Sequence, residues 1–178
     1  MGVLRQLFGP SKDEVWKQLC AKIDGNFVDG GFWKNSKVEA RVKEWTVTLD
    51  TFVVSTGKSH IPFTRMRAPF VNADGFHFKV YRENIFSGIG RMLGMQDIEV
   101  GHSEFDRAFI IKGNDPIKVQ MLFGNAEIRR LLEAQPSVGL MVKDDEGWFG
   151  RSFPEGVDEL YFQVPGVINS MESCPLCP

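Results

Sequence analysis

The stretch from Phe105 to Ala134 constrains the fold of this chain more than any other. It begins Phe-Asp-Arg-Ala-Phe-Ile-Ile-Lys-Gly-Asn-Asp-Pro and continues as an amphipathic run. We predict a strand for its first part, a tight turn at Gly-Asn-Asp-Pro, and one or two helices after the turn. The apolar positions of those helices are Val119, Leu122, Ile128, Leu131 and Leu132. A strand pattern is followed by a helix pattern within this one short unit. We therefore expect the unit to nucleate the core.

An amphipathic helix is predicted near the N-terminus. Ser11 and Glu14 have the spacing of a capping box, in which each side chain accepts a backbone N–H near the helix start. Apolar residues then recur at helical spacing at Val15, Trp16, Leu19, Cys20 and Ile23. Asp24-Gly25-Asn26 predicts the end of this helix.

From Phe27 to Tyr81, apolar and polar residues alternate along the chain, as they do in half-exposed strands. Short turns separate these stretches, so we predict an antiparallel meander. A helix is expected over 82–95, with a polar connection over 96–104. Three further strands are expected at 138–142, 148–149 and 160–164. Arg65, Arg67, Lys79 and Arg82 could share one face of adjacent strands and form a basic patch for phosphate groups. A solvated outer face is the usual reason for such charges, and we expect it here.

These patterns predict a single α+β domain over residues 1–166. It would consist of a curved, mostly antiparallel sheet packed by the N-terminal helix and the central helical segment. A small barrel of the pleckstrin-homology type is the alternative fold. Residues 167–178 are predicted to form a frayed tail that carries Cys174 and Cys177.

Composition excludes several function classes. With 178 residues and a net charge of −2, the chain lacks the strong positive charge of a nucleic-acid binder. No apolar run approaches the roughly twenty residues of a membrane span. The N-terminus lacks the pattern of a signal peptide, and three cysteines do not make a disulfide framework. We therefore expect a cytoplasmic protein.

No cofactor or metal is predicted. Gly88, Gly90 and Gly94 follow a predicted strand, but their spacing misses the dinucleotide fingerprint by one residue. Cys174 and Cys177 form a Cys-x-x-Cys pair without the second pair or the histidines of a zinc site. We interpret the glycines as part of a flexible or tightly packed helix, and the two cysteines as exposed thiols of a frayed tail.

The predicted helix over 82–95 is the candidate binding surface. Its apolar stripe suits a ligand, a protein partner or a second copy of the chain. The candidate residues on or near it are Ile85, Phe86, Ile89, Arg91, Met92 and His102. Because its polar face holds few basic residues, the same stripe argues only weakly for a membrane surface.

An acidic stretch provides the catalytic alternative. His102, Glu104 and Asp106 would point to one face of an extended strand, near Asp97 and Glu99. Such a set suits acid–base chemistry if the fold brings a second histidine, His60 or His77, beside it. The simpler interpretation is a solvated loop followed by a turn-capping Asp106.

Three segments resemble uncharacterised bacterial proteins that are classed under domains of unknown function. They are Tyr81-Arg82-Glu83-Asn84-Ile85-Phe86-Ser87, Gly94-Met95-Gln96-Asp97-Ile98-Glu99 and Phe105-Asp106-Arg107-Ala108-Phe109-Ile110-Ile111-Lys112-Gly113-Asn114-Asp115. The resemblance implies a bacterial source and a cytoplasmic or membrane-adjacent protein. It implies no activity, cofactor or catalytic residue.

Since no positioned nucleophile, metal set or phosphate loop is present in the sequence, we expect a non-enzymatic binding or protein-interaction module. The alternatives are a small-molecule enzyme that uses the Asp97–Asp106 acids with a histidine, and a peripheral membrane-surface protein.

Overall fold

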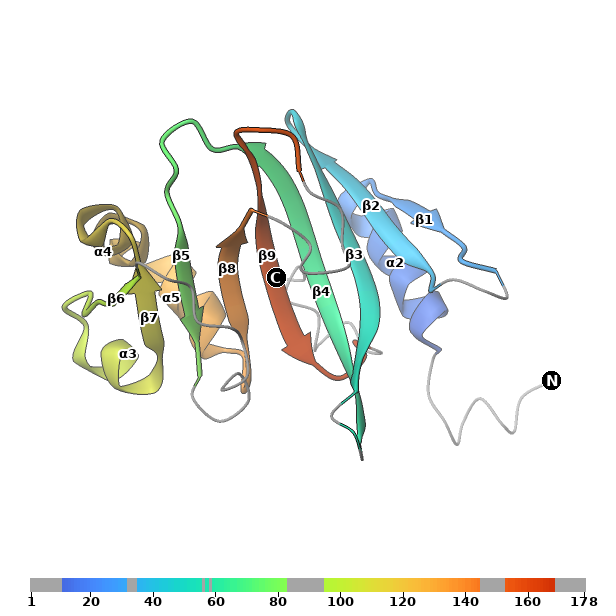
Figure 1. Ribbon diagram of the computed structural model, residues 1–178. Helices are drawn as coiled ribbons and strands as arrows, with labels where there is room; N and C mark the ends of the chain where they lie inside the picture. The colour runs from blue at the N-terminus through green and yellow to red at the C-terminus, as the bar shows by residue number, and fades with distance from the viewer. Residues whose placement is uncertain are drawn as a thin grey trace. The chain divides into compact units, whose positions relative to one another are not determined.

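The computed structural model describes residues 11–31, 35–55, 57, 59–82, 95–144 and 153–168. Within these residues nine strands form one sheet in the order β1-β2-β3-β4-β9-β8-β5-β7-β6, accompanied by helices α2 to α5 (Figure 1). The α+β class and the antiparallel sheet are as predicted. The sheet is not closed, so the barrel alternative is wrong.

Contacts divide the chain into two compact units, which are described separately. Unit 1 comprises residues 1–66 and 165–178, and unit 2 comprises residues 67–164. The chain passes from unit 1 to unit 2 within β4 and returns at the end of β9. The strands and helices are α2 (Lys12–Ile23), β1 (Asn26–Val28), β2 (Lys37–Val42), β3 (Trp45–Ser55), β4 (His60–Val71), β5 (Phe78–Tyr81), β6 (Gln96–Asp97), α3 (Ser103–Ala108), β7 (Ile110–Gly113), α4 (Pro116–Gly124), α5 (Ala126–Glu133), β8 (Gly139–Lys143) and β9 (Val157–Pro165).

In unit 1, helix α2 packs against β1 and β2. The predicted capping box is present at Ser11 and Glu14, and Asp24 ends the helix in the left-handed conformation. Trp16 is fully buried, and its Nε1 donates to the carbonyl of Ile168 at 3.1 Å. Ile168 is itself buried, so the predicted tail begins too early. Residues 169–178, with Cys174 and Cys177, lie outside the described residues.

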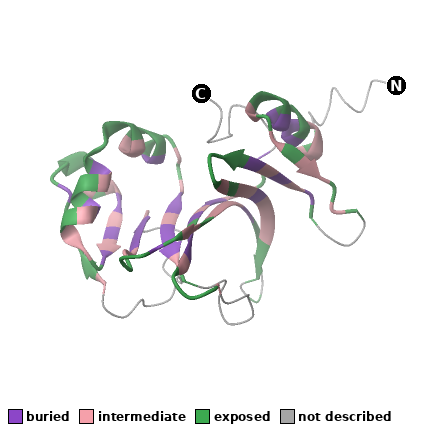
Figure 2. Ribbon diagram, turned by 90° about the horizontal axis from the view of Figure 1, so that it is seen from above, coloured by how far each residue is buried: buried purple, intermediate pink, exposed green. Residues whose placement is uncertain are grey.

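In unit 2, helices α3, α4 and α5 cover one face of the sheet formed by β5, β7 and β8. Phe78 of this face meets Phe123 of α4 edge-on, with ring centroids 5.7 Å apart, and Phe123 also contacts Phe105 of α3. Val80 and Ile111 are buried on the same face. Burial alternates along β7, whereas the first three residues of β5 are all buried; Figure 2 colours the strands by burial.

The segment that opens the sequence analysis differs from its prediction in one element. Phe105 and Asp106 lie in helix α3, not in a strand, and the strand is limited to Ile110–Gly113. Asn114 and the N-cap Asp115 form the predicted turn, and α4 and α5 follow as expected. Phe105 is an inward-facing helix residue that is 1% exposed, and its apolar neighbours made the stretch resemble a strand.

Gly113 of β7 permits a close approach of helix α4 to the sheet. A Cβ atom at this position would lie 2.7 Å from Cγ2 of Val119 and 3.3 Å from the carbonyl of His77. The absence of a side chain at Gly113 therefore sets the distance between β7 and α4.

Substitution Gly113→Ala is expected to destabilise the protein by about 1–3 kcal/mol, because the added methyl group overpacks the contact with Val119. Chemical denaturation of the two proteins measures the difference. Gly124→Ala is the matched control, since no atom lies within 4 Å of its added Cβ and alanine favours the helix. Equal stability of the Gly113→Ala variant and the parent would contradict the tight packing.

Candidate functional site

The sheet of unit 2 has a second face, opposite the helices, that is largely polar. Because side chains alternate along a strand and paired residues share a face, the register places one set of residues together on it. We call this set the polar face. It consists of Lys79, Tyr81, Asp97, Ile110, Lys112, Met141, Lys143, Glu159 and Tyr161.

Lys79 lies at the centre of the polar face. It is directly opposite Lys112 of β7 on one side and Met141 of β8 on the other. Its side chain is only 4% exposed, and its Nζ lies 4.8 Å from the ring centroid of Tyr81. The expectation that Lys79 belongs to a solvated surface is therefore wrong.

The pKa of Lys79 is lowered to about 8. Burial of the ammonium group is the main cause, and the positive charges of Lys112 and Lys143 add to it. On the neighbouring strand, the hydrogen bond to Asp97 raises the pKa of Lys112. The polar face thus holds three cationic side chains close enough to influence one another.

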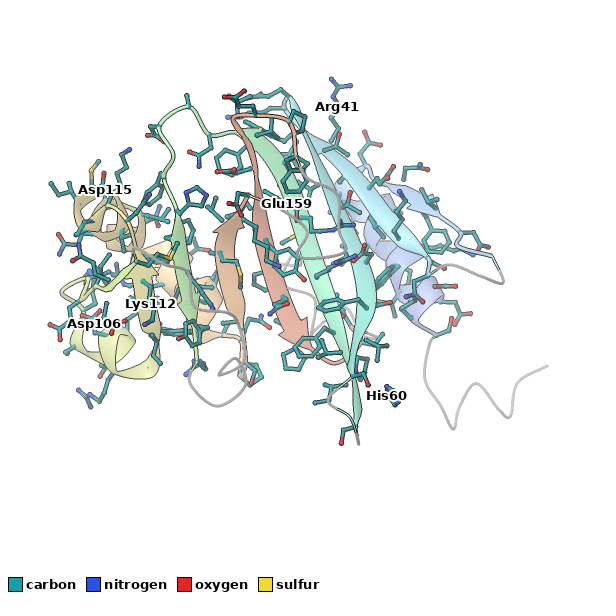
Figure 3. All side chains as sticks on the ribbon, in the orientation of Figure 1. Arg41, His60, Asp106, Lys112, Asp115 and Glu159 are labelled. Carbon is teal, nitrogen blue, oxygen red and sulfur yellow. The ribbon has the colours of Figure 1, made fainter. Side chains whose placement is uncertain are left out.

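Two tyrosines and two acids complete the polar face. The Nζ atom of Lys143 lies 3.4 Å from the ring centroid of Tyr161, a cation–π contact. Lys143 also lies opposite Glu159, which is buried. Figure 3 marks Lys112 on β7 and Glu159 on β9.

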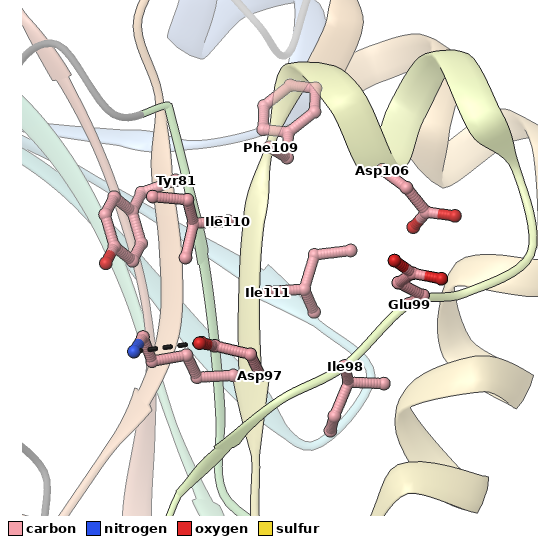
Figure 4. A pocket seen from close by; sticks show the side chains of 9 residues that line it. Tyr81, Asp97, Ile98, Glu99, Asp106, Phe109, Ile110 and Ile111 are labelled. Carbon is pink, nitrogen blue, oxygen red and sulfur yellow. Dashed lines mark ion pairs between the residues drawn. The ribbon is translucent and has the colours of Figure 1, made fainter.

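A pocket of about 500 Å³ opens beside this face. Its lining combines four polar-face residues with residues around the β6–β7 edge, and Figure 4 shows it from close by. The residues are Tyr81, Asp97, Ile98, Glu99, Asp106, Phe109, Ile110, Ile111 and Lys112. Aromatic and aliphatic side chains form its wall, and the carboxylates and the Lys112 ammonium supply its polar groups.

Two of the three acids in the pocket already have partners. Asp106 accepts the backbone N–H groups of Val100 and His102, each at 2.9 Å, and so holds the entry to α3. Asp97 pairs with Lys112 at 2.9 Å, the ion pair marked in Figure 4. Glu99 is the third acid. Its backbone carbonyl accepts from Gln120.

The sequence-predicted site residues are only partly brought together. Asp97, Glu99 and Asp106 do meet at the pocket, but no histidine lines it. His102 is the exposed N-cap residue of α3, and His102, Glu104 and Asp106 do not share a strand because this segment is helical. The capping role considered for Asp106 is confirmed. Ile85, Phe86, Ile89, Arg91 and Met92 lie outside the described residues.

The remaining basic residues of the predicted outer face have separate partners. Arg65, in unit 1, forms a bidentate ion pair with Asp50. Arg82, in unit 2, donates to the carbonyls of Gln135 and Glu133. Neither arrangement resembles a shared phosphate patch.

A second polar cluster in unit 2 has a structural role. The ring of His77 lies 3.0 Å from the carbonyl of Gly75 through Nδ1 and 3.2 Å from Asp158 through Nε2. The Asn72 side chain donates to Asp158 and exchanges hydrogen bonds with the backbone of Phe76. These bonds fasten the turn that precedes β5 to the start of β9.

No candidate metal centre is found in the described ranges, where no three His, Cys, Asp or Glu side chains are grouped to hold an ion. Among the helices of those ranges, none has the length and apolar character needed to cross a bilayer. Comparisons with family models, curated proteins and solved structures find no match to this chain. The resemblance noted above therefore stays a prediction.

The residues missed at the sequence level are Tyr81, Phe109, Ile110, Lys112 and Lys143, and Lys79 was expected on a solvated face. Alternation in 78–81 and 110–113 already places Lys79 and Lys112 on the side opposite Phe78, Val80 and Ile111. It does not show that the lysine side of these strands is buried, because that depends on the pairing of segments far apart in the chain.

The lowered pKa of Lys79 predicts a pH-dependent stability. Between about pH 8 and pH 10.5 the unfolded chain keeps a proton that the folded protein has lost, so the free energy of unfolding rises with pH in this window. Below pH 8 the cost of burying the ammonium is fully present. In Lys79→Met this contribution to the rise is absent.

Urea denaturation of both proteins between pH 7 and pH 10.5 provides the measurement. The parent is expected to gain stability relative to Lys79→Met, on the order of 1–3 kcal/mol across the window. A difference that stays constant over this range would show that the pKa of Lys79 is not lowered.

Proposed function

We propose that this protein is a non-enzymatic binding module and that its ligand occupies the pocket between β5, β6 and β7. The observation that carries the proposal is the composition of the pocket wall. Tyr81, Phe109 and Ile110 provide an apolar surface, and polar groups converge beside them. The volume of about 500 Å³ lies in the range of small-molecule sites.

The state of the carboxylates favours binding over acid–base catalysis. A carboxylate can act as a general base only if it is free to reach the substrate proton that it removes. Asp106 instead accepts two backbone N–H groups, and Asp97 is paired with a lysine. The catalytic alternative also required a histidine beside these acids, and the pocket lining contains none.

Filling the pocket tests this function. Ile110→Trp adds bulk to a residue of the pocket wall, whereas Leu131→Trp adds the same ring to an exposed position of α5. We expect small aromatic and aliphatic compounds screened by NMR to shift the amide signals of 97–99 and 106–112. The binding should be lost in Ile110→Trp and kept in Leu131→Trp.

Spectra recorded over hours follow the fate of each bound compound. Unchanged compounds agree with a binding module, whereas conversion of any of them would identify an enzyme. Signals that shift equally in both tryptophan variants would place the ligand elsewhere.

A further inference from the structure

The β3–β4 hairpin of unit 1 ends in an exposed apolar surface. The two strands are neighbours in the sheet, and both carry apolar residues close to the connection between them. Val53, Val54 and Ile61 are between 36% and 59% exposed, and Pro62 is exposed as well. We call these four residues the hairpin tip, and Figure 3 labels His60, which precedes Ile61. We propose that the hairpin tip docks on a lipid membrane surface that carries anionic headgroups.

Exposure on both faces of the hairpin is the first argument. Successive residues of a strand point to opposite faces, so Val53 and Val54 lie on different sides of β3. Both are exposed. A flat protein partner, or a second copy of the chain laid against the hairpin, would cover one of these sides. A lipid interface surrounds an inserted tip on every side, so it can remove both valines from water together.

Charge is the second argument. No acidic residue occurs between Asp50 and Asp74, a stretch that contains two arginines and one lysine, although the whole chain has a net charge of −2. Arg65 pairs with Asp50 at the base of the hairpin. The hairpin tip therefore holds no carboxylate that anionic headgroups would repel or that would lose its water on insertion, and its surroundings carry an excess of positive charge.

The base of the hairpin holds the tip in place. The ring of Phe52 stacks on the buried ring of Phe63, with centroids 5.5 Å apart. The backbone N–H of Gly166 donates to the carbonyl of Pro62 at 2.8 Å. These contacts fix both strands up to the tip. The apolar residues of the tip are thus exposed by the fold itself, and ordering them costs little when they dock.

Vesicle sedimentation with the full chain tests the proposal. The protein is mixed at pH 7 with vesicles of phosphatidylcholine alone, or of phosphatidylcholine and phosphatidylglycerol. We expect it to sediment with the mixed vesicles and to bind pure phosphatidylcholine at least about 5-fold more weakly, because insertion of a few apolar residues alone attaches a protein only weakly.

Two glutamate variants separate the hairpin tip from the rest of the surface. Ile61→Glu should weaken binding to the mixed vesicles at least about 10-fold, because it places a carboxylate in the inserted tip. Ile117→Glu is the matched control, since it makes the same substitution at an isoleucine of α4 that is 70% exposed, and it should leave binding unchanged. Circular dichroism verifies that both variants fold.

Tryptophan variants report insertion directly. In Ile61→Trp the added indole should move from water into the lipid interface, so vesicles should shift the fluorescence emission to shorter wavelength and binding should strengthen. In Ile117→Trp the added indole stays in water, and vesicles should change the emission no more than they do in the parent.

Several results would overturn the proposal. These are a parent protein that does not sediment, and equal loss of binding in Ile61→Glu and Ile117→Glu, which would reduce the effect to net charge. A dimer that forms without vesicles and is lost in Ile61→Glu would assign the hairpin tip to a second copy of the chain instead. Equal binding to both kinds of vesicle would overturn the assignment to anionic headgroups. None of these results bears on the pocket of unit 2, because the proposal does not rest on it.

Discussion

The register of the unit 2 sheet is the constraint on which its other features depend. Phe78, Val80 and Ile111 pack toward α3, α4 and α5, and this apolar burial allows only one pairing of β5 with β7. A slip of β5 by one residue would expose Phe78 and Val80, and a slip of β7 would expose Ile111. The same pairing fixes the opposite face, because side chains alternate along each strand. Packing against the helices thus sets the register of β5 and β7, and this register makes Lys79 and Lys112 direct neighbours on the opposite face.

The two faces of this sheet contribute differently to the stability of the fold. The apolar face gains stability from burial at about 25 cal/mol per Å². The polar face opposes part of that gain, since Lys79 is buried next to cations and its pKa falls to about 8. Contacts with the Tyr81 and Tyr161 rings and the Asp97 pairing moderate the cost. A sheet built only for stability would place apolar or uncharged residues at these positions.

Local signals in the sequence predicted the local structure well. Ser11 and Glu14 specify the start of α2, and Asp115 followed by Pro116 specifies the start of α4, because each satisfies backbone N–H groups within a few residues. Alternation likewise predicted β2, β3 and β4. The error at α3 has a local cause too: a six-residue helix is too short to display a helical period, and adjacent Phe109, Ile110 and Ile111 suggested an extended chain.

The candidate site could not be predicted in the same way, since it depends on pairings between distant segments. Lys79 and Lys112 become neighbours only through the β5–β7 register, and Lys143 joins them only through β8. Each lysine taken alone has the pattern of a solvent-facing strand residue. The acidic stretch, by contrast, was visible in sequence, but Asp106 serves the backbone of α3. Residues that cluster in sequence serve the fold here, whereas the lysines of the polar face come from three different strands.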